Sequence, residues 1–142
     1  MAIDLYKEIT EAFNLKEMNP RETAPLVLAY LGDTVYEVVV RTIESSRGNR
    51  QTGKLHKDSV KYVNAGTQAR MIEALLPHLT EEEEGYFRRG KNAHTPPTAK
   101  TATKADYHKA TGFEALVGFL YLTGQTDRLF ELIKQGMALL EK

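Results

Sequence analysis

Apolar residues recur at spacings of three and four along most of the chain, a pattern that predicts α-helices. The longest such stretch begins at Pro25 and reaches about Glu44. Its helical stripe consists of Leu28, Leu31, Val35, Val38, Val39 and Thr42. No segment shows the convincing alternation of apolar and polar residues that is typical of a β-strand. We therefore expect an all-α fold of about seven helices.

Turn and capping residues divide the pattern into seven expected helices. They cover residues 4 to about 15, 25 to about 44, 52–62, about 64–79, 80 to near 90, 107–122 and 127–141. The first is expected to be amphipathic, with Leu5, Ile9 and Phe13 four residues apart and Asp4 as its N-cap. Residues 93–103 contain two prolines and four threonines, and we expect them to form an exposed loop.

A run of four glutamates follows Thr80 and has two interpretations. It could be a catalytic cluster of acids, but a capping role explains it better. Thr80 would cap the helix, Glu83 would complete a capping box, and the remaining acids would complement the helix dipole.

Composition points to a single helical domain over residues 1–142. Hydrophobic residues make up 42% of the chain and charged residues 27%, as is usual for soluble globular proteins. The chain has no cysteine, which excludes disulfides, thiolate zinc sites and a cysteine nucleophile. Neither a signal peptide nor a membrane-spanning run is visible, so we expect a cytoplasmic protein with no membrane partner.

Positive charge is concentrated in two segments, although the formal net charge is zero. Residues 47–61 carry five basic residues against one acid, and residues 88–109 carry six against one. Two such segments suggest a patch that binds a polyanion. The alternative is that these are ordinary surface charges that face different ways.

Two acids stand alone in apolar helices. Asp33 is the only charged residue between Pro25 and Tyr36, and Glu114 is the only one between Thr111 and Thr123. Small residues flank both acids, so the two helices could approach closely and bring the carboxylates together. Converging anions need a cation, and oxygen ligands suit Mg²⁺. Each acid could instead bond a backbone group or an arginine.

Several motifs resemble the catalytic domain of the ribonuclease III family. The sequence Leu-Gly-Asp-Thr-Val at 31–35 is similar to the signature helix of that family, and Phe-Glu-Ala-Leu-Val-Gly at 113–118 is similar to its second acidic helix. Residues 55–57 and 68–69 resemble the intervening helices. The resemblance is strongest to the bacterial Mini-ribonuclease III branch, through residues 30–33, 89–93 and 110–116.

This resemblance implies an endoribonuclease that forms a homodimer and cuts double-stranded RNA with Mg²⁺, or with Mn²⁺ in its place. Asp33 and Glu114 would be the catalytic and metal-binding residues. In the Mini branch the implied substrate is the precursor of 23S ribosomal RNA.

The chain departs from the larger family at two positions where further acids are expected. Ala29 and Thr111 occupy them. One metal ion, held by Asp33 and Glu114 and completed by waters and RNA phosphate, is therefore the simpler expectation. Thr111 and Glu37 are candidates for further support, although Arg41 offers Glu37 an ion pair at the favourable i+4 spacing.

The basic segments are expected to contact the RNA through its phosphates and 2′-hydroxyls. The candidate residues are Arg88, Arg89, Lys91, Asn92, His94 and Lys100, followed by His56 and Lys57. No segment is left for a separate double-stranded-RNA-binding domain, so we expect weak, salt-sensitive binding. A ribosomal protein bound to the RNA could assist.

Two rival interpretations remain open. The chain could be a ribonuclease III fold that only binds structured RNA, without catalysis. It could also be a helical interaction protein with no role in RNA metabolism. Cleavage of duplex RNA that requires Asp33 would separate the catalytic interpretation from both rivals.

Overall fold

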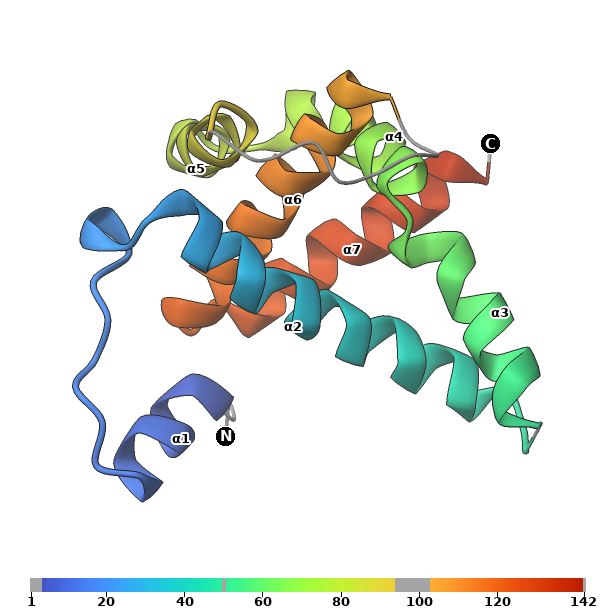
Figure 1. The fold of residues 1–142 in the computed structure, drawn as a ribbon, viewed down its shortest axis with the longest axis horizontal. Helices are drawn as coiled ribbons and strands as arrows, with labels where there is room; N and C mark the ends of the chain where they lie inside the picture. The colour runs from blue at the N-terminus through green and yellow to red at the C-terminus, as the bar shows by residue number, and fades with distance from the viewer. Residues whose placement is uncertain (1–3, 50, 94–102, 142) are drawn as a thin grey trace.

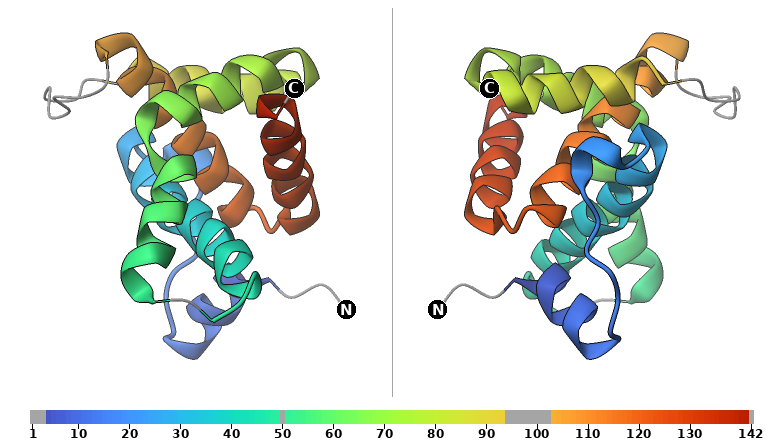
Figure 2. Two further views of the ribbon diagram at one scale, coloured as in Figure 1. Left: turned by 90° about the vertical axis from the view of Figure 1, so that its right-hand side faces the viewer. Right: turned by 90° about the vertical axis from the view of Figure 1, so that its left-hand side faces the viewer.

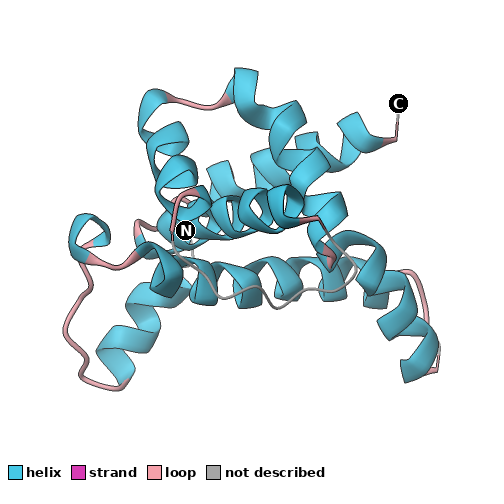
Figure 3. Ribbon diagram, turned by 45° about the horizontal axis from the view of Figure 1, so that its top comes forward, coloured by secondary structure: helices cyan, strands magenta, loops and turns pink. Residues whose placement is uncertain are grey.

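The computed structural model describes residues 4–49, 51–93 and 103–141. Within these ranges the chain forms seven α-helices and two short 3₁₀-helices, and Figure 3 shows only helices and loops there. The elements are α1 (Leu5–Ala12), η1 (Pro20–Glu22), α2 (Pro25–Ser46), α3 (Thr52–Val63), α4 (Ala65–Leu75), η2 (Leu76–His78), α5 (Glu81–Lys91), α6 (Lys104–Leu122) and α7 (Thr126–Leu140). The predicted all-α class and the number of helices are confirmed.

Local chemistry sets most helix starts. The Asp4 side chain accepts a hydrogen bond from the Lys7 backbone N–H at 3.1 Å and caps α1. Thr80 and Glu83 form the predicted capping box, with both reciprocal hydrogen bonds present at 2.9 and 3.1 Å. The capping role predicted for the four glutamates is therefore confirmed.

Three boundaries differ from the prediction by three residues or more. The first helix ends as α1 at Ala12, before the expected residue 15. The helix expected to reach residue 79 ends as α4 at Leu75, and η2 follows because Pro77 has no backbone N–H to continue an α-helix. The sixth helix starts at Lys104, one turn earlier than expected, because Thr103 caps it by accepting from the Asp106 N–H. Most of the predicted loop at 93–103 lies outside the described residues.

Helix α6 runs through the middle of the helical array in Figures 1 and 2, in contact with α2, α4, α5 and α7. Eleven of its nineteen residues are buried, among them Phe113, Leu116 and Leu120. A helix that is apolar on all sides needs neighbours on all sides. The core therefore surrounds α6, and the other helices are arranged with respect to it.

The face that helix α2 buries overlaps its predicted apolar stripe only in part. Its buried residues are Leu28, Ala29, Gly32, Tyr36, Val40 and Glu44. Of the predicted stripe only Leu28 is buried, whereas Val38 is 58% exposed. The small residues Ala29 and Gly32 contact α6 because they allow the two backbones to approach, so Leu31, Val35 and Val39 of the stripe pack only partly against the core.

Helix α1 lies apart from the helices around α6 (Figure 1). Its predicted apolar stripe is mostly exposed, with Leu5 at 57% and Phe13 at 72%. Tyr6 holds the helix instead, because its ring packs edge-on against Tyr121 at 5.6 Å and its hydroxyl accepts from the Met18 N–H. The prediction of an amphipathic helix thus stands, but this part of the structure leaves its apolar side uncovered.

An ion pair joins α5 to α7. The Arg128 guanidinium on α7 donates to both carboxylate oxygens of Glu83 on α5, each at 2.8 Å, and to the His78 carbonyl at 2.9 Å. Glu83 is buried, and the hydrogen bond from Arg128 holds the pKa of Glu83 below its usual range. The same carboxylate therefore caps α5 and fixes α7.

No α-helix within the described ranges is long and apolar enough to cross a membrane.

Candidate active site

The site lies where α2 crosses α6, and two glycines set how closely the helices approach. A Cβ atom on Gly32 would lie 1.8 Å from the backbone oxygen of Glu114, and one on Gly118 would lie 2.0 Å from the backbone oxygen of Leu28. Any larger residue would push the backbones apart. The pair of glycines therefore fixes the register of the crossing, with Asp33 directly after one glycine and Glu114 four residues before the other.

The crossing brings the Asp33 and Glu114 carboxyl groups together. Asp33 is exposed and Glu114 is half-buried. Burial, the hydrogen bond to Asp33 and the charge on Asp33 together raise the pKa of Glu114 to about 9. The predicted convergence of these two acids is present in the structure.

No basic side chain in the described ranges forms an ion pair with either acid, so without a metal ion the repulsion between the two carboxyl groups is relieved only by a proton on Glu114. Two carboxylates that repel each other at a partly open position are a suitable pair of ligands for a hard divalent cation. The residues present thus fit a metal ion that takes its remaining ligands from water or substrate. Among the described residues no group of three or more acids or histidines is placed to hold a metal by itself.

The side chains of Glu37 and Thr111, the two candidates for further support, are engaged elsewhere. Glu37 forms an ion pair with Arg41, as the spacing predicts. Thr111 is buried, and its hydroxyl donates to the Tyr107 carbonyl at 2.9 Å. Ala29, at the other position where an acid was expected, is buried.

Gln68 of α4 is a site residue that sequence reasoning did not single out. It is 2% exposed, and its amide lies close enough to the Glu114 carboxyl to lower the pKa of Glu114, against the stronger effect of burial. The motif at 68–69 drew attention to this position, but nothing in the sequence indicates that its side chain reaches α6.

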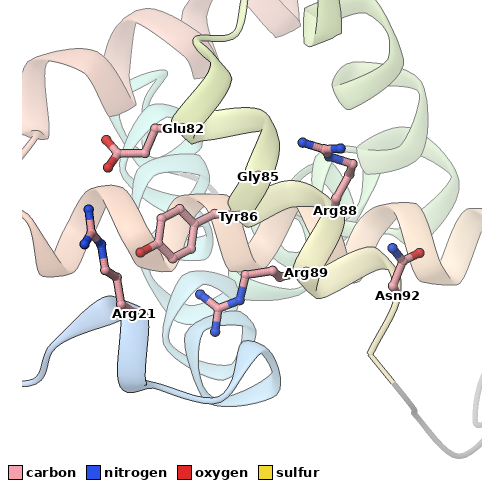
Figure 4. Close-up of a pocket in the computed structure, with 7 residues that line it drawn as sticks. All are labelled: Arg21, Glu82, Gly85, Tyr86, Arg88, Arg89 and Asn92. Atoms are coloured by element: carbon pink, nitrogen blue, oxygen red, sulfur yellow. The ribbon is translucent and has the colours of Figure 1, made fainter.

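The predicted RNA-binding residues of α5 divide into two kinds. The guanidinium of Arg89 donates to the backbone carbonyls of Thr23 at 3.0 Å and Pro20 at 3.4 Å, and it lies 5.1 Å from the ring centroid of Tyr86. Arg88 is exposed and, in Figure 4, points away from the segment that Arg89 holds. Arg89 therefore has a structural role, whereas Arg88 presents its charge to solvent.

An open depression of about 780 Å³ lies beside these arginines (Figure 4). Its lining consists of Arg21, Glu82, Gly85, Tyr86, Arg88, Arg89 and Asn92. Arg21, from η1, was not among the predicted residues. It joins Arg88 and Arg89 only because Arg89 holds η1 against α5, a contact between segments far apart in the sequence.

The remaining predicted cations are dispersed. Lys91 is exposed near Glu73 of α4, whose pKa is lowered mainly by the hydrogen bond from Lys109 and further by the charge on Lys91. His56 and Lys57 are exposed on α3, which Figure 1 shows well apart from α5. Among the described residues, His56 and Lys57 therefore do not share a patch with the exposed residues of α5. His94 and Lys100 lie outside the described residues.

Comparison with known proteins gives a consistent result. The ribonuclease III domain family matches residues 26–125. A protein of Symbiobacterium thermophilum named Mini-ribonuclease 3 is 44% identical over 124 residues, which is 87% of this chain and 95% of that protein. A Mini-ribonuclease 3 of Brevibacillus brevis is 43% identical over 123 residues, with 87% and 92% covered. The crystal structure of a Fusobacterium nucleatum protein superposes with a TM-score of 0.75 at 28% identity, over 83% of this chain and 94% of that one.

Proposed function

Since the chain belongs to the ribonuclease III family, and within it to the Mini-ribonuclease 3 group of endoribonucleases, we propose that it hydrolyses double-stranded RNA with Mg²⁺ held by Asp33 and Glu114. The observation that carries the proposal is the convergence of these two carboxyl groups with no basic partner in the described ranges. The raised pKa of Glu114 marks a position where negative charge is poorly compensated. Such positions are typical of functional sites.

The residues of the chain would bind the metal ion and orient it. Oxygen atoms of Asp33 and Glu114 would hold the ion at the α2–α6 crossing, and the two glycines would keep that crossing rigid. When bound, the ion supplies activation of a water for in-line attack and stabilises charge on the displaced oxygen. Mn²⁺ prefers similar oxygen ligands and would serve in its place.

Exposed basic and polar residues at the end of α5 would position the RNA backbone. Arg88, Lys91 and Asn92 are exposed near the end of α5, and Gly90 packs this end against α6 close to Thr111, one turn before Glu114. Contacts to phosphates fix the register of a duplex without reading its sequence. His56 and Lys57 would meet a separate part of a long duplex, because α3 lies apart from α5.

We also propose that the chain acts as a homodimer. Leu5, Ile9, Leu31, Val35, Val38 and Phe130 line an apolar groove of about 340 Å³ between α1, α2 and α7. Tyr30 on α2 is 77% exposed. Apolar surface of this extent is typical of an interface, and a twofold dimer would set two sites against the two strands of a duplex.

We propose that residues 1–142 form one catalytic domain. The family match ends at residue 125, yet α7 is fixed to α5 by Arg128 and packs against α4 and α6. The precursor of 23S ribosomal RNA is the proposed substrate, with a ribosomal protein as helper and the cytoplasm as the place of action. The relationship to Mini-ribonuclease 3 proteins supports the proposed substrate and place of action. The small number of clustered cations supports the need for a helper.

Incubation of a long RNA duplex with the wild type and with Asp33→Asn, with and without Mg²⁺, tests the proposal. We expect cleavage only by the wild type with Mg²⁺, and a loss of at least about a hundredfold in Asp33→Asn. Asp127→Asn, which removes an exposed acid from the first turn of α7, serves as the control and should cut like the wild type.

Binding without cleavage by all three proteins would favour the alternative of a non-catalytic RNA-binding module. Equal cleavage by Asp33→Asn and the wild type would show that another group carries the reaction. A precursor ribosomal RNA duplex, compared with an unrelated duplex of the same length, then tests the substrate.

A further inference from the structure

Gln68 occupies an unusual position for an amide. It lies in the second turn of α4, between the buried residues Thr67 and Ala69, and only 2% of its surface is exposed. The Nε2 atom of Gln68 is buried and has no hydrogen-bond partner in the described part of the chain. Nearly all buried polar groups in proteins are hydrogen-bonded, and an unpaired one destabilises the folded state. Such an amide needs an explanation.

The neighbour of this amide is the Glu114 carboxyl. Helix α4 packs along α6 and brings the Gln68 amide beside the Glu114 carboxyl, although the Nε2 atom does not reach hydrogen-bond geometry. Asp33 faces the same carboxyl from α2. Glu114 therefore lies between an acid that repels its charge and an N–H donor that has no other partner.

We propose that Gln68 is a positioning residue that donates a hydrogen bond to the Glu114 carboxylate and fixes its orientation toward Asp33 when a divalent cation binds. The inference rests on the function proposed above. Carboxylates that bind metals are commonly oriented by such partners. An amide suits this task because it is neutral: a lysine or arginine here would orient the carboxylate but would also compensate its charge and compete with the cation.

Titration of the metal-free protein with Mn²⁺ alone, followed by the electron paramagnetic resonance signal of the unbound ion, tests this inference. Gln68→Met removes the donor and keeps a side chain of similar length. We expect its affinity for Mn²⁺ to fall about 10–100-fold. Its melting temperature without metal should be unchanged or higher, because the amide that is lost was unpaired.

Thr67→Val is the matched control, since it also removes a polar group that is buried on α4. We expect it to bind Mn²⁺ like the wild type. A merely structural role for Gln68 predicts the opposite pattern, with a lower melting temperature and unchanged affinity. RNA cleavage gives a second measure: the activity of Gln68→Met should approach that of the wild type at high Mn²⁺ concentration.

Unchanged affinity in Gln68→Met would overturn the inference and leave the proposed function intact. Failure of the proposed function gives a different result, because wild type and Asp33→Asn would then bind Mn²⁺ equally. If Gln68→Met does not fold, Gln68→Asn replaces it. The shorter amide cannot reach Glu114, so wild-type affinity in Gln68→Asn would likewise overturn the inference.

Discussion

At the scale of single residues, the Glu114 carboxyl is subject to two opposed influences. Its burial and the nearby Asp33 disfavour its charge, whereas the Gln68 amide favours it. The first effect dominates in the metal-free protein, where the pKa of Glu114 is about 9 instead of the ordinary 4.5. The same arrangement prepares the position for a cation, since a bound cation would reverse the balance.

This balance predicts how stability depends on pH in the metal-free protein. Between the two pKa values the folded protein holds a proton on Glu114 that the unfolded chain has released, so the free energy of unfolding falls as pH rises through this window. Glu114→Gln is neutral at every pH and should lose this dependence. Urea denaturation with a chelator at about pH 5 and about pH 8.5 measures it, and each unit of pKa shift corresponds to about 1.4 kcal/mol.

We expect the free energy of unfolding of Glu114→Gln, relative to that of the wild type, to rise by at least about 1 kcal/mol between the lower and the higher pH. Asp127→Asn provides the comparison for the loss of one carboxylate far from the site. Parallel pH profiles of Glu114→Gln and the wild type would show that Glu114 is not held in its neutral form.

The glycines at the crossing allow a second prediction at this scale. Gly32→Ala would place a methyl group 1.8 Å from the backbone oxygen of Glu114, which neither helix can accommodate without moving. We expect a loss of about 3 kcal/mol or more in the free energy of unfolding, measured by urea denaturation, together with loss of RNA cleavage.

Gly85→Ala is the matched control because it too lies in a helix, but a Cβ there meets nothing within 4 Å. Its free energy of unfolding should rise by about 0.5–1 kcal/mol, because alanine has a higher helix propensity than glycine. Equal effects of the two substitutions would contradict the close approach of α2 and α6.

The sequence allowed the acids to be predicted but not the residue that orients one of them. Asp33 and Glu114 are conspicuous because each is an isolated charge in an apolar helix, flanked by small residues. Gln68 is not conspicuous, since a single glutamine in α4 looks like any helical surface residue. Its burial depends on how α4 packs against α6, and Gln68 and Glu114 are more than forty positions apart in the sequence.

At the scale of helices, most boundaries were predictable, whereas the faces that α1 and α2 bury were not. Caps are local, so Asp4, Thr80 and Glu83 could be assigned from the sequence. The face that α2 buries depends instead on its partner. Because α2 and α6 approach through glycines, α2 buries Ala29 and Gly32 beside Leu28, Tyr36 and Val40. A pattern that counts only large apolar residues therefore predicts a face that is rotated from the buried one.

Helix α5 also shows how packing separates neighbouring residues of like charge. Arg88→Ala should leave the melting temperature unchanged, because the side chain is exposed, but should weaken duplex RNA binding and reduce its salt dependence by about one phosphate contact. Arg89→Ala should lower the free energy of unfolding by about 1–3 kcal/mol, because its guanidinium bonds the Pro20 and Thr23 carbonyls.

Thermal melts and fluorescence-anisotropy titrations over a range of salt concentrations measure both effects. Lys134→Ala, on α7, removes an exposed lysine away from α5 and should change neither quantity. If Arg88→Ala binds duplex RNA with wild-type affinity and salt dependence, α5 does not contact the backbone through this residue.

At the scale of the whole molecule, apolar surface is left over after the core is formed. The outward stripe of α2, the exposed side of α1 and Phe130 of α7 meet around one groove. Phe130 is 49% exposed, and a second apolar groove of about 400 Å³ adjoins it along α7. The described part of the chain therefore leaves the predicted apolar stripe of α1 exposed and buries most of the α2 stripe only partly.

A second copy of the chain is the occupant that the proposed function requires. A charge introduced within the groove would have to be buried without a partner when two copies associate. Val38→Glu and Phe130→Glu, alone and together, should therefore produce monomers at concentrations where the wild type is dimeric, as measured by sedimentation velocity. The fold should persist, because both side chains are already exposed at 58% and 49%.

Val60→Glu is the matched control, an apolar residue of similar exposure, 40%, on α3 and away from the groove. It should remain dimeric. The monomeric variants should retain Mn²⁺ binding, since Asp33 and Glu114 belong to one chain, but should cut only one strand of a duplex per encounter. Dimers that persist in the double variant would place the interface elsewhere, and a monomeric wild type would exclude the twofold arrangement altogether.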